Sequence, residues 1–348
     1  MNAIHRLNSI DEYNVGSRFD LPPDWTYCDW NESLFPPTPL VKQYILNFLE
    51  EKSIQSYPDI SNKQLIKKIS EYTNLPQNFI EVYNGSDDAL RDIFTTFVDE
   101  GKKVMSYQPS YSQVDTFIQT NTSFYKKNQI TKPLSDHIYD FSCCEEYDVV
   151  YLINPNNPTG KEIKVNDIKN LISTFSKTLF VIDEAYFEYS GVTSSSLVSN
   201  YKNILITRTF SKAFGIASLR LGYVIGNPET LKDLKKIKNR KTVNSLAQIA
   251  GIACLSDIEY LNKCVNETKE SINLFFNEVS KIKDYEVFKS STNFILVKVP
   301  NVEEFIEKMK SKKIITRDRS YLDGLDGCVR LNLGPIALTK NIINHIKG

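Results

Sequence analysis

The chain has 348 residues, which is enough for about two domains, and its 41% hydrophobic and 24% charged content is ordinary for a globular protein. Its 42 basic and 42 acidic residues give a formal net charge of zero, so we expect no nucleic-acid partner. The N-terminus has no apolar segment like that of a signal peptide, and no stretch approaches 18 apolar residues. We therefore expect a cytoplasmic protein without a membrane partner.

Metal binding is not expected either. The six cysteines show no C-x-x-C spacing, and the three histidines (His5, His137 and His345) lie far apart in the sequence. Free thiols in a reducing compartment are the simplest interpretation.

Strand-length apolar segments alternate with segments of helical periodicity between residues 79 and 226. The predicted strands are residues 79–83, 103–107, 149–153, 179–183, 204–207 and 222–225, and the predicted helices are 87–98, 111–119 and 165–175. This alternation is typical of α/β proteins with a mostly parallel sheet covered by helices.

A different pattern follows in the C-terminal third. Residues 228–282 predict a long helical stretch that breaks near Ser256-Asp257. Strands are then predicted at 285–289, 294–299, 314–317 and 329–333, with helices at 302–311 and 338–346. Such grouping indicates a separate, smaller α+β domain.

Small polar residues follow the first predicted strand, in Asn84-Gly85-Ser86. Gly85 would let the backbone approach a ligand, and the free N–H groups of the next helical turn would form an anion site. This signal is nonspecific. The sequence also holds neither G-x-x-x-x-G-K-[ST] nor G-x-G-x-x-G, so the usual anchors for nucleoside triphosphates and dinucleotides are missing.

Two further predicted strands end in polar residues. Asn157 lies in Tyr151-Leu-Ile-Asn-Pro-Asn-Asn-Pro-Thr-Gly160, at the carboxyl end of a strand, where open α/β sheets bind ligands. An ordinary Asn/Pro turn is the alternative. Asp183 is the first polar residue after four apolar ones, and a carboxylate in such a partly dry place needs a cationic partner, such as a protonated pyridine nitrogen. A helix N-cap is the alternative there.

The most informative segment is Thr207-Arg-Thr-Phe-Ser-Lys-Ala-Phe-Gly215, followed by Arg220. A lysine that forms an imine with a cofactor aldehyde must be held on a short turn. A neighbouring hydroxyl such as Ser211 and a nearby arginine would serve a phosphate on the same cofactor. In isolation Lys212 would be interpreted as a solvated surface lysine. The segments that contain Gly85, Asn157 and Asp183 favour a cofactor-binding lysine instead, because each of them suits a part of the same cofactor.

In chain order the sequence carries NGSDD, PSY, NPNNPTG, DEAY, TFSKAFG with a following arginine, and ITRDRS with CVRLNLG. These motifs resemble the pyridoxal-phosphate-dependent aminotransferases of fold type I (class I/II), and within them the histidinol-phosphate aminotransferase subgroup. The resemblance extends from about Asp29 to the end of the chain. It implies pyridoxal 5'-phosphate as cofactor and a homodimer whose site lies between domains and across the subunit interface. The expected parts are residues 1–30, packing with the small domain, 31–240, the large cofactor-binding domain, and 241–348, the small domain.

The resemblance also implies roles for individual residues. Lys212 resembles the lysine that forms the imine, and Asp183 resembles the carboxylate that pairs with the pyridine nitrogen. Asn157 and Tyr186 resemble the donors to the phenolic oxygen of the ring, and Tyr111 resembles the aromatic that stacks on its face. The expected catalytic residues are Lys212, Asp183 and Tyr186.

Other residues of the resembled family bind the cofactor phosphate. The matching positions here are Ser86, Asp87, Ser211 and Arg220. Tyr57, in Ser56-Tyr-Pro-Asp59, is similar to the tyrosine that reaches the cofactor phosphate of the neighbouring subunit.

Substrate binding is expected from Asn31, Arg317 and Arg330. The two arginines lie thirteen residues apart and end strand-like segments, and two converging arginines favour a phosphate or a carboxylate. In the resembled subgroup the matching arginines hold the substrate phosphate. A surface salt bridge is the alternative for Arg330. Arg319 has no assigned role and is expected to be solvated.

One segment departs from the subgroup, whose N-terminal pattern resembles N-E-N-P-x-G. Here the chain reads Asp29-Trp-Asn-Glu-Ser-Leu-Phe-Pro-Pro37, which keeps Asn31 and Glu32 but not the residues after them. The expected function is aminotransfer between a small phosphorylated amine or carbonyl compound and glutamate or 2-oxoglutarate. The substrate is histidinol phosphate, in amino acid biosynthesis, or another phosphorylated carbonyl compound, for example one for a surface saccharide. The alternatives are a decarboxylase of serine- or threonine-phosphate, which shares this scaffold, and a non-catalytic protein of the same fold.

Overall fold

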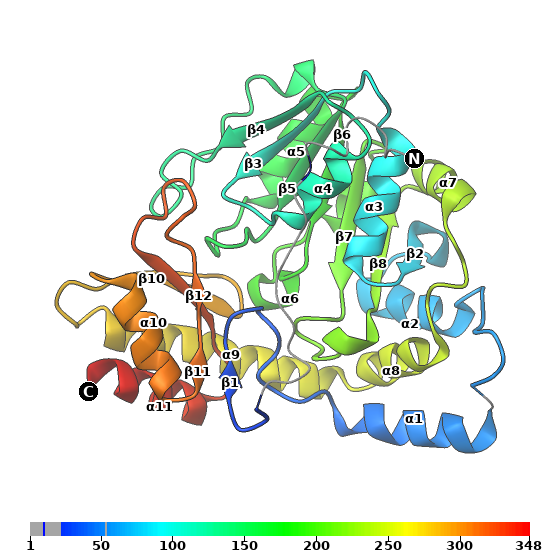
Figure 1. The fold of residues 1–348 in the computed structure, drawn as a ribbon. Helices are drawn as coiled ribbons and strands as arrows, with labels where there is room; N and C mark the ends of the chain where they lie inside the picture. The colour runs from blue at the N-terminus through cyan, green and yellow to red at the C-terminus, as the bar shows by residue number, and fades with distance from the viewer. Residues whose placement is uncertain (1–9, 11–21, 53) are drawn as a thin grey trace, which may run out of the picture.

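The computed structural model describes residues 10, 22–52 and 54–348. Its centre is a seven-stranded sheet with strand order β2-β8-β7-β6-β5-β3-β4 (Figure 1). The strands are β2 (Ile80–Tyr83), β3 (Val104–Gln108), β4 (Tyr125–Gln129), β5 (Val149–Ile153), β6 (Leu179–Asp183), β7 (Ile204–Thr209) and β8 (Gly222–Gly226). Within this sheet β8 runs against its neighbours β2 and β7, and the other pairs are parallel. The predicted α/β class with a mostly parallel sheet is confirmed.

Helices cover both faces of this sheet, which explains why its inner strands are apolar throughout. One face packs on α3 (Ser86–Phe97), α4 (Gln113–Gln119) and α7 (Pro228–Ile237). The opposite face packs on α2 (Lys63–Thr73), α5 (Val165–Thr174) and α8 (Ser245–Leu255). Successive residues of β5 show the alternation, since Val150 faces one core and Tyr151 the other.

A second, antiparallel sheet follows, with order β12-β13-β10-β9. Its strands are β9 (Glu286–Phe288), β10 (Phe294–Lys298), β12 (Arg317–Asp318) and β13 (Cys328–Asn332). Three helices bury one face of it, namely α9 (Ile258–Val279), α10 (Val302–Ser311) and α11 (Ile336–Lys347). Beside it, β1 (Thr26–Tyr27) pairs in parallel with β11 (Ile314–Ile315). The predicted smaller α+β part is confirmed.

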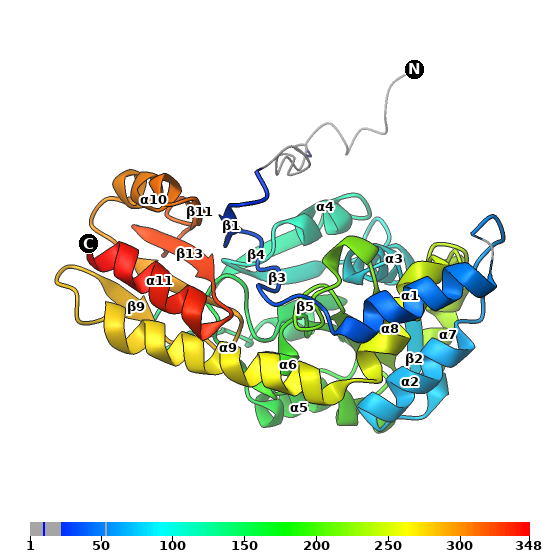
Figure 2. The ribbon, with the colours of Figure 1, turned by 90° about the horizontal axis from the view of Figure 1, so that it is seen from below.

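The long helix α9 connects the two parts (Figure 2). Leu261 and Val265, in its first half, belong to the core of the large sheet, whereas Ile272 and Phe275 belong to the core of the small sheet. The domain boundary that we expect near residue 240 stays a prediction. Most of the N-terminal part expected to pack with the small domain, residues 1–9 and 11–21, lies outside the described residues.

Three sequence-based expectations need correction. The helical stretch over 228–282 breaks near Ser256 as predicted, but it breaks a second time between α7 and α8. The second helix, α8, begins at its own N-cap, Asn244, whose side chain accepts a hydrogen bond from Ala247 N (2.8 Å). The strand expected at 314–317 is divided into β11 and β12. The strands β1 and β4 and the helices α1 (Pro39–Glu51) and α2 were not predicted. Among the described residues, none of the helices has the length and apolarity to cross a membrane.

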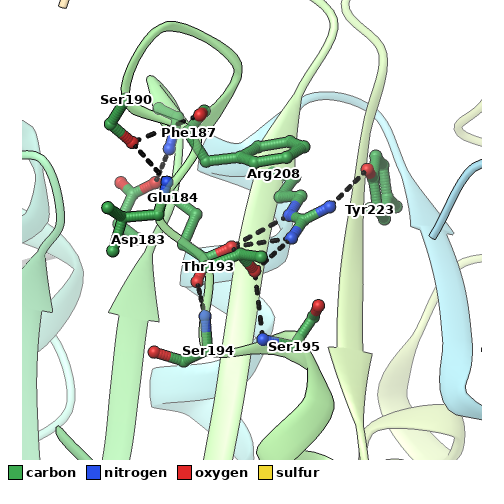
Figure 3. A network of polar contacts seen from close by, with 11 residues as sticks. Asp183, Glu184, Phe187, Ser190, Thr193, Ser194, Ser195, Arg208 and Tyr223 are labelled. Carbon is green, nitrogen blue, oxygen red and sulfur yellow. Dashed lines mark hydrogen bonds and ion pairs between the residues drawn. The ribbon is translucent and has the colours of Figure 1, made fainter. Parts of the chain in front are cut away.

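A buried ion pair joins the ends of the two central strands (Figure 3). Glu184 directly follows β6, and Arg208 lies on β7. Arg208 donates to Glu184 Oε2 from Nε (3.0 Å) and from Nη2 (2.8 Å), and the Arg208 and Glu184 side chains are 3% and 0% exposed. Ser194 N donates to the other carboxylate oxygen (2.6 Å), and Thr193 Oγ1 donates to Oε2 (2.8 Å). The carboxylate is therefore fully enclosed by donors.

The guanidinium of Arg208 extends this connection to neighbouring elements. Its Nη1 donates to the hydroxyl of Tyr223 on β8 (3.4 Å). Its Cζ lies 3.5 Å from the ring centroid of Phe187, in α6 (Phe187–Ser190). The Arg208 side chain therefore connects the adjacent strands β6, β7 and β8 with the loop that follows β6.

We predict that Arg208→Met lowers the free energy of unfolding by about 3–5 kcal/mol, because it leaves the Glu184 carboxylate buried without a cation. Urea denaturation measures this change. The matched control is Arg91→Met, since Arg91 is 58% exposed and its ion pair with Asp88 contributes at most about 1 kcal/mol. A loss for Arg208→Met no larger than that of the control would contradict the prediction.

Candidate active site

A cleft of about 1000 Å³ lies between the carboxyl ends of the central strands and the small sheet. It is lined by every expected site residue except Tyr57: Asn31, Ser86, Asp87, Tyr111, Asn157, Asp183, Tyr186, Ser211, Lys212, Arg220, Arg317 and Arg330. The ends of parallel strands bring together segments that are far apart in sequence. Tyr57 lies elsewhere, with 78% of its side chain exposed and Lys241 Nζ 4.5 Å from its ring centroid.

Lys212 lies in the turn that follows β7. The turn closes through a hydrogen bond from Gly215 N to Lys212 O (3.2 Å), and Gly215 has a φ of +71°, which favours glycine. The Lys212 amine donates to the backbone carbonyl of Trp30 (3.0 Å). Burial, aided by the positive charge of Arg330, lowers the pKa of Lys212 to about 8. About a tenth of this amine is therefore neutral at pH 7 and able to attack a carbonyl, far more than for an ordinary lysine.

Asp183 ends β6 and is 4% exposed. Its carboxylate accepts hydrogen bonds from Tyr151 Oη (3.0 Å) and Ala185 N (3.2 Å). Burial raises the pKa of Asp183 to about 6 in spite of these bonds. The group is thus an ionised carboxylate at neutral pH that would be stabilised by a cation in the cleft. Asp183 does not cap a helix, so the N-cap alternative is excluded.

A group of polar side chains surrounds the start of α3. Arg220 donates to Ser211 Oγ (3.3 Å) from Nη1 and to Asp87 Oδ2 (3.0 Å) from Nη2. The other oxygen of Asp87 accepts from Tyr111 Oη (3.0 Å). A guanidinium, a hydroxyl and the N-terminus of a twelve-residue helix therefore meet at one end of the cleft. This combination suits a phosphate.

Two glycines allow this close approach. A Cβ at Gly222, on β8, would lie 2.6 Å from Ser86 N, at the start of α3. A Cβ at Gly85 would lie 2.8 Å from Arg220 Nη2, and Gly85 also has a φ of +86°. The backbone here is shaped to bring the helix N-terminus and the guanidinium together, as a phosphate site requires.

The opposite wall of the cleft comes from the small sheet and the N-terminal segment. Asn31 Nδ2 donates to Tyr186 Oη (3.0 Å). Arg330 donates from Nη1 to Asn157 Oδ1 (2.6 Å) and from Nη2 to Asp29 O (2.5 Å). Arg330 is 3% exposed, so it does not form a surface salt bridge. Burial and the nearby Arg319 lower the pKa of Arg330 to about 9, which leaves it cationic at neutral pH.

Sequence reasoning missed several contributors to this site. Arg319 was expected to be solvated, but it is partly buried and lines the cleft. Tyr151, which binds Asp183, resembled an ordinary core residue of an apolar strand. Trp30 contributes its backbone carbonyl, and no side-chain pattern in the sequence indicates that role. Within the described ranges, no three His, Cys, Asp or Glu side chains are grouped to hold a metal ion.

Taken together, the cleft offers an amine with a lowered pKa, a buried carboxylate for a ring cation, and a phosphate site. These are the groups that a phosphorylated aromatic aldehyde with a basic ring nitrogen requires. Pyridoxal 5'-phosphate is such a compound, so the residues present fit it.

Comparison with known proteins also indicates an enzyme that uses pyridoxal 5'-phosphate. The family of class I and II aminotransferases matches residues 26–346. A dihydroxyacetone phosphate transaminase of Campylobacter jejuni is 34% identical over 329 residues, covering 91% of this chain and 87% of that protein. A histidinol-phosphate aminotransferase of Methanocaldococcus jannaschii is 32% identical over 323 residues, covering 90% of this chain and 86% of that protein.

The fold also matches solved structures. A histidinol-phosphate aminotransferase from Sinorhizobium meliloti, in complex with pyridoxal-5'-phosphate, superposes with a TM-score of 0.82 at 23% identity, covering 92% of this chain and 89% of that one. The sequence match spans nearly the whole chain at more than 30% identity to the two relatives above. The protein therefore belongs to the class I and II aminotransferases, which are transaminases of fold type I that use pyridoxal 5'-phosphate.

Proposed function

We propose that this aminotransferase transfers an amino group between glutamate or 2-oxoglutarate and a small phosphorylated amine or carbonyl compound. The observation that carries the proposal is the pairing of Arg317 with Arg330 across β12 and β13, on the wall of the cleft. Like charges directly opposite each other destabilise a sheet, so an anionic ligand is the natural partner for the pair. Both relatives described above are named for phosphorylated compounds.

In this proposal the cofactor is held by the residues grouped around it. Arg220, Ser211 and the N-terminus of α3 would bind its phosphate, and Tyr111 would stack on its ring. Bound pyridoxal 5'-phosphate supplies an electron sink that stabilises negative charge at the substrate carbon. Asp183 keeps a proton on the ring nitrogen, because its ionised carboxylate favours the cationic ring.

Lys212 is the proposed general base and acid. Its Nζ would remove the proton from the substrate carbon that bears nitrogen and would return a proton during the same turnover. A pKa of about 8 suits both directions near neutral pH. Asn157 and Tyr186 would orient the ring oxygen, and Asn31 would fix Tyr186 through its hydrogen bond (3.0 Å).

A panel of substrates tests this function, in which each phosphorylated compound is paired with its unphosphorylated form. It includes dihydroxyacetone phosphate with dihydroxyacetone as amino acceptors, and histidinol phosphate with histidinol as donors. Loss of a charge-assisted contact costs about 1.5–3 kcal/mol, so we expect kcat/KM to be about tenfold to a hundredfold higher for the phosphorylated form. A coupled assay of glutamate or 2-oxoglutarate gives the rates.

Equal rates for the two forms would contradict the phosphorylated-substrate proposal. Carbon dioxide release from O-phosphothreonine, without amino transfer, would instead identify the protein as a decarboxylase.

We also propose that the active unit is a homodimer in which Tyr57 completes the cofactor site of the partner. Figure 1 shows α1 at the outer edge of the large part. Apolar residues are exposed in α1 and in the loop that follows it. They are Leu46, Leu49, Ile54, Tyr57 and Ile60. Exposed apolar residues gathered in this way are typical of protein interfaces.

Two differently tagged chains, Tyr57→Ala and Lys212→Ala, test this sharing when they are co-expressed and the mixed dimer is purified through both tags. The mixed dimer should be active although each parent dimer is not, because one of its two sites carries neither change. The control pairs the wild-type chain with a chain that carries both changes. That dimer should be nearly inactive, since each of its sites carries one change. Equal activities of the two mixed dimers, or a monomer in sedimentation, would rule out the shared site.

A further inference from the structure

His137 is a buried histidine that lies behind the cleft and does not line it. It belongs to the loop 131–138, which follows β4 and is closed by two backbone hydrogen bonds between Thr131 and Ile138, both 2.9 Å long. His137 N also donates to Lys132 O (2.9 Å), and its side chain is 9% exposed. The closed loop therefore fixes the place from which the imidazole extends.

The loop is also held from the side of the small sheet. Leu134 packs against an apolar cluster that consists of Phe288, Leu296, Leu325 and Cys328. Leu296 is directly opposite Arg330 in the β10–β13 pair, so Leu134 covers the face of the sheet that carries Arg330. Pro133 is packed closely on Gly324, where a Cβ would lie 2.9 Å from Pro133 Cγ. The loop thus connects the small sheet with the region behind the cleft.

On its other side the imidazole reaches the turn that presents Asn157. His137 Nε2 lies 3.0 Å from Thr159 Oγ1, and Thr159 is 2% exposed. Burial, aided by the positive charge of Lys161, lowers the pKa of His137 to about 4, so the ring is neutral near pH 7 and one nitrogen can accept. Thr159 Oγ1 itself accepts from Asn156 Nδ2 (2.9 Å), which leaves its hydroxyl hydrogen to donate to His137 Nε2.

Asn156 extends this connection to a second segment of the site. Its Nδ2 also donates to Pro109 O (3.1 Å), and Asn156 is 2% exposed. Pro109 lies two residues before Tyr111, whereas Asn156 directly precedes Asn157. One buried amide therefore joins the segment that carries the aromatic residue to the segment that carries the polar one.

We propose that His137 is a positioning residue of the active site. It acts through the hydroxyl of Thr159 and the amide of Asn156. The result is one fixed placement of Asn157 and Tyr111 toward the cofactor ring, and the inference rests on the roles that the proposed function gives to these two residues. A buried hydrogen-bond network holds a single arrangement, because the alternatives leave polar groups unpaired. Without the imidazole acceptor, the Thr159 hydroxyl would turn to another partner and the turn would lose this support.

The test compares holoenzymes that carry His137→Phe, Thr159→Val or both changes. Phenylalanine keeps a ring that can pack on Tyr139, which the imidazole contacts edge-on at 4.9 Å between centroids, but it cannot accept a hydrogen bond. Equilibrium dialysis should show the Kd of pyridoxal 5'-phosphate raised about fivefold or more in each single variant. Because both changes break the same connection, the double variant should bind about as weakly as either single variant.

A spectroscopic measurement separates positioning from a general loss of stability. Asn157 is the proposed donor to the ring oxygen of the cofactor, so its placement affects the pH at which the visible absorption of the bound cofactor changes. His137→Phe should shift that midpoint by about half a pH unit or more, in the same direction as Asn157→Ala. His345→Phe is the matched control, because His345 lies in α11 and outside the cleft, and it should equal the wild type in both measurements.

A wild-type Kd and a wild-type midpoint in His137→Phe would overturn the inference. Losses that add up in the double variant would also overturn it, since His137 would then act by a route other than Thr159. If His137→Phe does not fold, Thr159→Val alone decides by the same two measurements. If Asn157→Ala itself leaves the midpoint unchanged, the proposed role of Asn157 fails instead.

Discussion

The Glu184–Arg208 ion pair is the contact on which the geometry of the cleft depends. Glu184 is the residue after Asp183, and Arg208 lies four residues before Lys212, so the pair joins the two segments that carry these groups. The strands themselves pair in parallel, with Asp183 beside Thr207. A buried ion pair adds little net stability over an apolar alternative, but removal of one partner is costly. We infer that the pair fixes one relative position for the ends of β6 and β7. Figure 3 shows the contacts that join them.

The charges in the cleft are arranged for ligands that are themselves charged. Burial raises the pKa of Asp183 to about 6 and lowers the pKa values of Lys212 and Arg330 to about 8 and 9. A raised pKa for an acid and a lowered pKa for a base both mean that the charged forms cost stability near pH 7. A cationic ring near Asp183 and an anionic substrate near Arg330 would offset that cost. Binding of cofactor and substrate should therefore also stabilise the fold.

The sequence predicts the elements whose physical signal is local. β5 and β6 match their expected bounds because each is a continuous apolar segment that ends abruptly in polar residues. The strand β4, Tyr125-Lys-Lys-Asn-Gln129, has no apolar pattern and exists through its pairing with β3, which no local signal reveals. Asn157, Asp183 and Ser86 could be found because each lies at or just after the end of an expected strand, whereas the family resemblance supplied most of the other cleft residues. Arg319 was expected to be solvated, although a spacing of two from Arg317 along a strand places both side chains on one face.

Lys212 is the residue to which we expect the cofactor to be attached, and covalent trapping can test this attachment. Treatment of the holoenzyme with borohydride, followed by proteolysis and mass spectrometry, locates the attached cofactor in the sequence. We predict a single labelled peptide that contains Lys212, and no label in a Lys212→Arg variant treated in the same way. A label on another lysine, or a holoenzyme that loses its cofactor unmodified after borohydride, would contradict it.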